Sequence, residues 1–309
     1  MLAFVVRRLI VGAGVLVGVS LVTFLIAFVV PADPAVAMAG AKADPQTLAM
    51  IRTQLGLDQP LYVQYCRYIA RAIEGDLGRS YIRGESVTAL ILGRFPATAI
   101  LAVTAMALAL LLGVVMGLAS GAWRERLPDH VLLVLSLGFV SMPVFWIGTM
   151  LLIGAALYVR ALPLGGFSGW TSLILPSLTL ALGSAGYYAR ILHTNLSDAL
   201  DQEYVRTARG KGLPRWRVLA KHALANALIP LLTLAGLDFA GLLSGVVLTE
   251  TVFNWPGIGR LAYEAVVNLD IPLIMGTVLF DAVLVIAANI AVDVLYAWLD
   301  PRIRLGAIG

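Results

Sequence analysis

Long apolar runs, each ended by a short polar segment, are the main pattern along this chain. Residues 9–32, 97–123 and 131–159 contain no charged residue. Each run is longer than the roughly 20 residues with which a helix crosses the hydrocarbon core of a bilayer. Three further runs, at about 171–189, 227–249 and 275–298, contain at most two acids each. Backbone groups in lipid must be hydrogen-bonded within the protein, so the pattern predicts an all-α integral membrane protein with six transmembrane helices.

The composition agrees with a membrane protein. Of the 309 residues, 60% are hydrophobic and 13% are charged, and the mean hydropathy is +0.90. A soluble core cannot bury that share of apolar side chains. The net charge of +4 comes from basic residues that are concentrated in the predicted loops. They do not form a nucleic-acid-binding face. We therefore expect a lipid bilayer, and no nucleic acid, around this chain.

The distribution of Lys and Arg predicts the orientation of the six helices. Segments on the side of the amino terminus carry 13 of these residues, including seven between Arg190 and Lys221. The short loops on the opposite side carry only Arg160 and Arg260. Seven more lie in the long 31–96 segment, where the charge bias counts little. Both termini are predicted to be cytoplasmic, in a multi-pass protein of the cytoplasmic (inner) membrane.

The sequence predicts that residues 31–96 form an extracytoplasmic, scoop-like segment between a first transmembrane helix at 1–30 and a core transmembrane domain at 97–309. Within it, residues 46–55 and 62–74 have helical patterns, and Gly75, Gly78 and Gly84 follow them. Cys66 is the only cysteine, so no internal disulfide can link this segment. Ala35 and Ala37 resemble a signal cleavage site, but the apolar run before them has the length of a retained span.

Glycines recur four residues apart in three of the predicted spans. The sets are Gly14 and Gly18; Gly113, Gly117 and Gly121; Gly241 and Gly245. This spacing lets helix backbones approach closely in a membrane. The approach is expected within one bundle or at a dimer face.

The cytoplasmic segment 193–226 is too long to be a simple connection. Acidic residues precede a helical stretch at 204–209, Gly210 and Gly212 end it, and a second helical stretch follows at 216–225. Such a helix–turn–helix element is suited to insert into a pocket on a soluble partner. Two alternatives remain open: an interfacial helix anchored by Trp216, or basic residues that only fix the orientation.

Several motifs give this chain a family resemblance. Arg206-Thr207-Ala208, three residues and then Gly212 resembles the EAA-xxx-G coupling loop of permease subunits in type I ABC importers, although Arg206 stands where that motif begins with glutamate. The following stretches resemble the dipeptide, oligopeptide and nickel branch, and in particular its first permease with a large outer loop: LGLDQPLYVQY (55–65), GDLGRSY (75–81), EYVRTARGKG (203–212), NALIP (226–230), TETVFNWPGIGRLAYEA (249–265) and DPRIR (300–304).

The resemblance implies the partners and the mechanism. It implies a second homologous permease, two cytoplasmic ATPase subunits and an extracytoplasmic substrate-binding protein. ATP and Mg would lie on the ATPases, and this chain, which has no G-x-x-x-x-G-K-[ST] motif, would bind no cofactor itself. The mechanism would be alternating access. The implied cargo is small peptides of two to several residues, with nickel complexes or another small solute as the alternative.

The resemblance and the residue pattern together name two groups of candidate residues. The coupling residues are Glu203, Arg206, Thr207, Ala208, Arg209, Gly210, Lys211 and Gly212. The pathway or gate candidates are Asp238, Asp281, Asn289, Trp255, Pro256 and Gly257. Polar residues inside spans are costly and are functional candidates by default, but hydrogen bonds between helices or a structural turn would explain them equally well. Asp293 lies one turn beyond Asn289, near the cytoplasmic end.

Two other functional classes, an intramembrane serine protease and a secondary transporter, fit the sequence less well. Residues 166–169 read Gly-Phe-Ser-Gly, as in six-span intramembrane serine proteases, but His130, His193 and His222 all map to the side opposite Ser168. A secondary transporter would need no coupling element. We expect no catalytic residue and no metal site.

Overall fold

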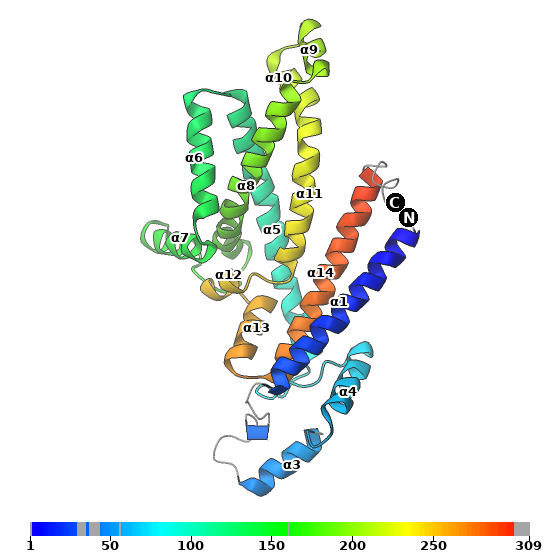
Figure 1. Ribbon diagram of the computed structural model, residues 1–309. Coiled ribbons are helices and arrows are strands. Elements are labelled where there is room, and N and C mark those ends of the chain that lie inside the picture. The colour runs from blue at the N-terminus through cyan, green and yellow to red at the C-terminus, as the bar shows by residue number, and fades with distance from the viewer. Residues whose placement is uncertain (1, 30–34, 37–43, 56, 160, 300–309) are drawn as a thin grey trace. The chain divides into compact units, whose positions relative to one another are not determined.

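The computed structural model describes residues 2–29, 35–36, 44–55, 57–159 and 161–299, and most of these residues are helical (Figure 1). The DPRIR motif and the predicted loop cations Lys42, Arg160, Arg302 and Arg304 lie outside this part of the chain. Two compact units divide it. One comprises Met1–Thr98, Leu243–Val247 and Pro256–Gly309, and the other comprises Ala99–Leu242 and Leu248–Trp255.

The first unit contains α1 (Leu2–Val29), α3 (Pro45–Leu55), α4 (Leu61–Ile73), α13 (Ile258–Val267), α14 (Ile271–Leu299) and the start of α5 (Val87–Ala122). Helices α1 and α14 pack together, because a Cβ at Gly12 would lie 2.7 Å from Cγ2 of Ile286. An ion pair of 3.0 Å joins Arg8 to Asp293 across the same contact. Helices α3 and α4 confirm the helical stretches predicted at 46–55 and 62–74.

A buried carboxylate fixes the turn that follows α4. Asp270, just before α14, accepts hydrogen bonds from Ser80 Oγ and from the backbone N–H of Tyr81, at 3.1 Å. Ser80 Oγ in turn accepts the Arg83 N–H at 2.9 Å. The Arg83 guanidinium pairs with Glu264 of α13 at 2.6 Å. The GDLGRSY stretch is therefore fastened to the α13–α14 junction.

The second unit contains the rest of α5, together with α6 (Leu127–Ser141), α7 (Val144–Tyr158), the short helix η1 (Trp170–Leu173), α8 (Ile174–Leu200), α9 (Glu203–Gly210), α10 (Arg215–Arg217), the π-helix η2 (Val218–Ala223), α11 (Leu224–Leu243) and most of α12 (Val247–Val252). Its core is formed mainly by α5, α8 and α11, around Tyr188, Leu192 and Leu231.

The glycines of α5 lie directly against α8. A Cβ would come within 2.6 Å of Tyr188 Cβ at Gly113, 2.9 Å of Leu192 Cβ at Gly117, and 2.5 Å of Leu196 Cδ2 at Gly121. Helix packing within the chain is thereby confirmed for this set. Around Gly14 and Gly18 a Cβ would meet no described atom within 4 Å.

The span predicted at 131–159 is not one straight helix. It is divided into α6 and α7, which are bent by 104° relative to each other. Met142, between them, has an extended backbone (φ −83°, ψ 133°) and precedes Pro143. Proline disfavours the helical conformation of the residue before it, so the helix ends there despite the continuous apolar sequence.

Four described helices are long and apolar enough to cross a membrane: α1, α5, α14 and the continuous η2–α11. The α6–α7 pair raises this number to five if it is one bent span. Helix α8, where the sixth span is predicted, has 27 residues, and its second half carries Arg190, His193 and Asp198. The structure thus supports an all-α membrane fold, while α8 extends past the predicted end of its span and into the segment predicted as a loop from residue 193.

Substitution of Gly117 by Ala should destabilise the second unit. The new methyl group would overlap Leu192 Cβ and approach the Ala189 carbonyl oxygen at 3.0 Å, and overpacking of this kind costs about 1–3 kcal/mol. The matched control is Gly138→Ala in α6, where a Cβ meets no described atom within 4 Å. Thermal unfolding of the purified protein in nanodiscs should show a lowered midpoint for Gly117→Ala alone; equal midpoints would refute the close α5–α8 contact.

Substitution of Asp270 by Ala should loosen the 80–83 turn, because it leaves buried donors without their acceptor, at a cost of about 1–3 kcal/mol. The readout is limited proteolysis of the full chain in nanodiscs, which should cut near Arg79 or Arg83 faster than in the parent. Exposed Asp58→Ala is the control. An unchanged cleavage rate at this turn would show that Asp270 does not hold it.

Candidate functional site

Residues 201–223, called here the α9 element, connect α8 to α11. Helix α8 ends at Leu200, and Gln202, with an extended backbone (φ −72°, ψ 151°), is the N-cap of α9. Glu203 lies in the first turn of α9 and Arg209 in the last. This order of charges stabilises a short helix through its dipole. Only two residues separate α9 from the long α8.

The end of α9 is a Schellman motif. Gly212 has a φ of +73°, which glycine adopts without the strain that a Cβ would cause. Its N–H donates to the Arg209 carbonyl at 2.9 Å, and the Leu213 N–H donates to the Ala208 carbonyl at 3.4 Å. These are the two hydrogen bonds that define the motif. Gly210, by contrast, is still helical and is not the turn residue.

The α9 element has its own apolar interior. Val205, Ala208 and Val218 are buried together, with Leu200 and Leu213 packed against them. Since Ala208 is only 5% exposed, its side chain is a packing group and does not lie on the surface. A larger side chain at this position would push α9 away from η2.

The other predicted coupling residues lie on the surface of α9 and its turn. Thr207 Oγ1 donates to the Glu203 carbonyl at 3.0 Å. The remaining exposed residues are Glu203, Arg206, Arg209, Gly210, Lys211 and Gly212. The structure therefore separates the predicted set into one buried side chain and an exposed, mainly basic surface.

The helix predicted at 216–225 is part of a longer one, since α10, η2 and α11 follow one another without a break. Pro214 accepts the N–H groups of Arg217 and Val218 at 2.9 and 3.2 Å, which begins this helix. The π-helical segment widens it at 218–223, a feature that is frequent at functional sites. Trp216 is 66% exposed beside the Arg217 guanidinium.

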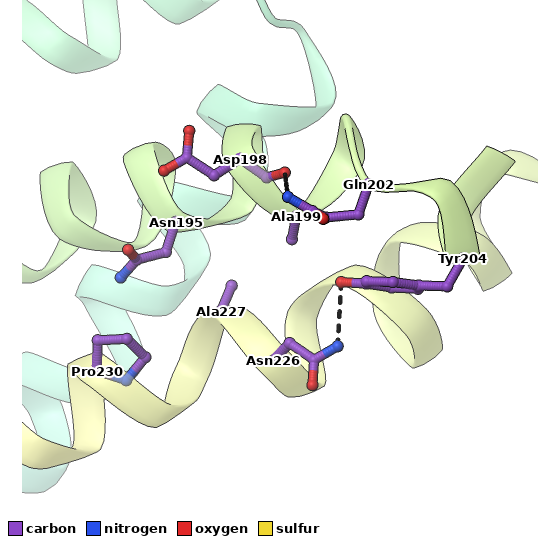
Figure 2. Close-up of a pocket in the computed structure, with 8 residues that line it drawn as sticks. All are labelled: Asn195, Asp198, Ala199, Gln202, Tyr204, Asn226, Ala227 and Pro230. Atoms are coloured by element: carbon purple, nitrogen blue, oxygen red, sulfur yellow. Dashed lines mark hydrogen bonds between the residues drawn. The ribbon is translucent and has the colours of Figure 1, made fainter.

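A hollow of about 290 Å³, lined by both polar and apolar side chains, lies beside the element (Figure 2). It is bounded by α8, the start of α9 and the start of α11. Tyr204 Oη accepts a hydrogen bond of 3.0 Å from Asn226 Nδ2, which links α9 to α11. The lining residues are Asn195, Asp198, Ala199, Gln202, Tyr204, Asn226, Ala227 and Pro230. Sequence analysis did not find this hollow, although Asn226 belongs to the NALIP motif.

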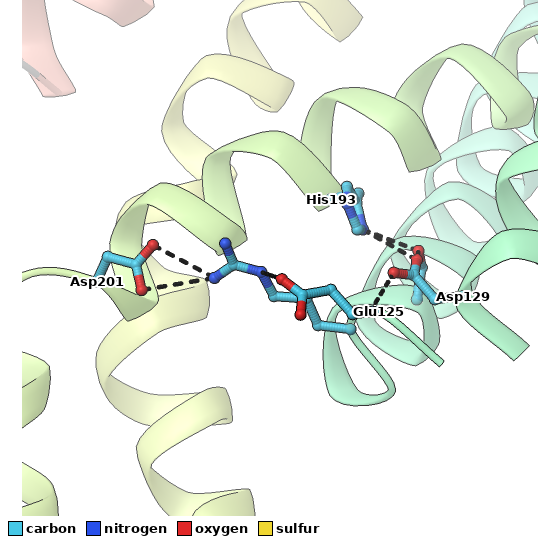
Figure 3. Close-up of polar contacts among 6 residues, drawn as sticks. Glu125, Asp129, His193 and Asp201 are labelled. Carbon is cyan, nitrogen blue, oxygen red and sulfur yellow. Dashed lines mark hydrogen bonds and ion pairs between the residues drawn. The ribbon is translucent and has the colours of Figure 1, made fainter. Parts of the chain in front are cut away.

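A polar cluster joins α5, α6 and α8 near the same end of the unit (Figure 3). Ser120 Oγ donates to the Asp129 carboxylate and lies 2.8 Å from His193 Nδ1. Asp129 also accepts the Glu125 N–H at 2.9 Å. Arg124 pairs with Asp201, the C-cap of α8, at 3.3 Å. The cluster was not predicted from the sequence, in which its only sign is a polar residue near the matching end of each helix.

The pathway candidates have separate positions. Asp238 of α11 accepts a hydrogen bond of 2.7 Å from Tyr188 Oη of α8. Asp281 and Asn289 lie half-buried in α14. Asp293 is the partner of Arg8 described above. The sequence left two explanations open for these residues, a functional role or hydrogen bonding between helices. For Asp238, the structure shows the hydrogen bond between helices.

The predicted gate-like turn follows α12. Trp255 is fully buried and contacts the Phe167 ring edge-on, with centroids 5.0 Å apart. Pro256 is half-buried, and Gly257 is the N-cap of α13. Neither α12 nor α13, with six and ten residues, is long enough to cross a membrane. Among the described residues, no group of three or more His, Cys, Asp or Glu side chains is placed to hold a metal ion.

The fold resembles two solved ABC transporters. An amino acid ABC transporter with histidines has a TM-score of 0.53 at 16% identity, covering 67% of this chain and 93% of that one. The MetNI methionine ABC transporter in an inward-facing conformation has a TM-score of 0.54 at 15% identity, covering 68% and 96%. At these identities the likeness establishes the fold alone.

The sequence comparisons establish the family. Residues 109–305 match the binding-protein-dependent transport system inner membrane component, and residues 1–102 match its N-terminal counterpart. The glutathione transport system permease protein GsiC is 41% identical in Salmonella paratyphi A and 40% identical in Escherichia coli (strain K12). Each alignment covers 98% of this chain and 99% of the relative. The protease and secondary-transporter alternatives are thereby set aside. The chain belongs to the inner membrane permease subunits of binding-protein-dependent ABC importers.

Proposed function

We propose that this permease subunit forms, with a second homologous permease, the path by which an ATP-driven importer moves small peptides across the inner membrane. Two cytoplasmic ATPase subunits would carry the ATP and Mg, and an extracytoplasmic binding protein would deliver the peptide. Both termini would be cytoplasmic. The 40–41% identity to GsiC over nearly the whole chain supports a peptide of about the size of glutathione.

The α9 element would be the coupling site for an ATPase subunit. This assignment rests on how the α9 element is built. A Schellman turn and a buried apolar interior make it a compact unit, while Arg206, Arg209 and Lys211 are exposed on its surface. A rigid element with exposed cations can be held by a protein pocket and moved as one body. A flexible loop in its place would absorb the motion.

Helix α8 would carry that motion away from the element. It packs closely against α5 at three glycines, and the Tyr188–Asp238 hydrogen bond joins it to α11. Gly186 brings it equally close to the backbone of α6 at Ser136. Packed helices of this kind rotate or slide as a block, since interiors are bistable and do not deform smoothly. Alternating access would follow from movement of this block.

The pathway itself is proposed to include Asp281 and Asn289, which lie half-buried in α14. Their polar groups suit the amide bonds and charged ends of a peptide. We assign Asp238 first to helix–helix contact, because its carboxylate is already hydrogen-bonded to Tyr188. The 249–260 turn, with Trp255, Pro256 and Gly257, is proposed as part of the outer gate.

Substitution of Gly212 by Asp should uncouple transport from ATP hydrolysis. A residue with a Cβ is strained at φ +73° by about 1–2 kcal/mol, so the Schellman turn would open and α9 would lose its fixed position. In proteoliposomes that contain the complete complex, peptide uptake per ATP hydrolysed should fall severalfold, while insertion of the permease is unchanged.

The matched control for this experiment is Gly210→Ala. Both glycines have open space around a Cβ, but only Gly212 has a positive φ, so Gly210→Ala should transport normally. Ala208→Arg, which enlarges a buried side chain, should behave like Gly212→Asp. Normal uptake in both Gly212→Asp and Ala208→Arg would contradict the coupling role of the element.

The substrate class can be tested in the same proteoliposomes. Binding protein loaded with glutathione or another short peptide should stimulate both ATP hydrolysis and uptake. Binding protein incubated with a nickel complex serves as the comparison. Stimulation by the nickel complex alone would replace the peptide assignment while leaving the coupling role intact.

A further inference from the structure

Helix α4, in the segment between α1 and α5, has three faces of different chemistry. Tyr65, Tyr68 and Ala72 form an inner face. Tyr62, Cys66, Ala70 and Ile73 form an exposed and largely apolar stripe, and Arg67 and Arg71 form a basic row beyond it. Tyr62 is 72% exposed and Ile73 is 82% exposed. An amphipathic helix in water would turn its apolar stripe inward. We therefore expect the exposed stripe to be covered by lipid or by another protein.

The inner face of α4 packs against the membrane spans. Tyr65 Oη is hydrogen-bonded to Ser20 Oγ of α1 at 2.9 Å, and the Tyr65 ring contacts Phe24 edge-on. Tyr65 and Tyr68 both join the cluster formed by Phe24, Ile271 and Met275. Ile271 and Met275 belong to the first turns of α14. Helix α4 is thus held against the ends of two spans.

This contact fixes the depth of α4. The apolar span of α1 is Val6–Ala27, so Ser20 lies seven residues, or about 10 Å along the helix, inside the end of the span. A side chain that bonds Ser20 must lie below the outer boundary of the hydrocarbon layer.

We propose that α4 is embedded in the lipid interface of the bilayer, with the Tyr62–Cys66–Ala70–Ile73 stripe against acyl chains and Arg67 and Arg71 at anionic headgroups. Helices that combine an apolar stripe, a basic row and aromatic side chains bind membrane interfaces in this way. Arginine side chains at this depth reach the headgroups by extending along their apolar stems. The turn before α4 helps to hold the helix in this position. Gln64 Nε2 donates to the Gln59 carbonyl at 2.8 Å, and this hydrogen bond fixes where the helix begins.

The occupant is lipid because of the depth and the charge together. A soluble binding protein stays in water, whereas the Tyr65 side chain on the inner face of α4 reaches Ser20, inside the end of the α1 span. The two arginines carry the charge opposite to that of anionic lipid headgroups, which adds electrostatic attraction to the burial of the apolar stripe. The inference concerns the membrane position of α4 and does not depend on which solute is transported.

Cys66, the single cysteine of the chain, lies in the exposed stripe and provides the probe. The full chain would be labelled there with an environment-sensitive fluorophore and reconstituted into nanodiscs of phosphatidylcholine and phosphatidylglycerol. Lipids brominated near the headgroup should reduce the fluorescence by roughly twofold or more, as for a helix at the interface. Aqueous iodide should have little effect.

The control carries Cys66→Ala and Asp58→Cys, which moves the label to an exposed position in the turn before α4. It should respond to iodide and not to brominated lipid. In the parent, bromolipid quenching should increase with the phosphatidylglycerol fraction, and Arg67→Gln with Arg71→Gln should remove that increase.

Two results would overturn the proposal. One is a Cys66 label that iodide quenches as strongly as the Asp58→Cys label, with no effect of brominated lipid. The other is a label that becomes shielded from iodide only when the binding protein is added. That result would show that the binding protein, and not lipid, covers the stripe.

Discussion

The close contact of α5 with α8 is the constraint on which the rest of the second unit depends. Gly113, Gly117 and Gly121 leave no space for a Cβ between the two helices. In a membrane, where lipid is as apolar as the protein interior, such backbone contact replaces the hydrophobic drive. It fixes α8, and α8 in turn holds the α9 element at its end. The polar cluster of Ser120, Asp129 and His193 fastens the same pair of helices to α6.

The element at the end of α8 combines a fixed interior with an exposed basic surface. Its turn depends on backbone conformation at Gly212, and its interior depends on the small size of Ala208. Neither residue needs to touch a partner. In the proposed coupling role, the exposed arginines and the lysine around them would face the partner. This division explains why a motif of small residues is combined with a cationic surface, and it fits a permease that receives motion from a separate ATPase.

Sequence alone predicted the all-α membrane fold, the helices at 46–55 and 62–74, and the glycine turn at the end of α9, because these depend on local patterns. It did not predict the bend at Met142–Pro143, since an apolar run gives no sign of its direction. It also missed the Asp129–His193 and Tyr188–Asp238 contacts. These join residues 50 or more positions apart, and only the packing of the helices brings them together.

The central claim is that the α9 element contacts an ATPase subunit. The most direct measurement replaces Arg206 with a photoreactive amino acid in the assembled complex, in native membranes. Arg206 is exposed on α9, so the account predicts a covalent adduct with the ATPase subunit on illumination. Adducts with lipid alone would contradict it.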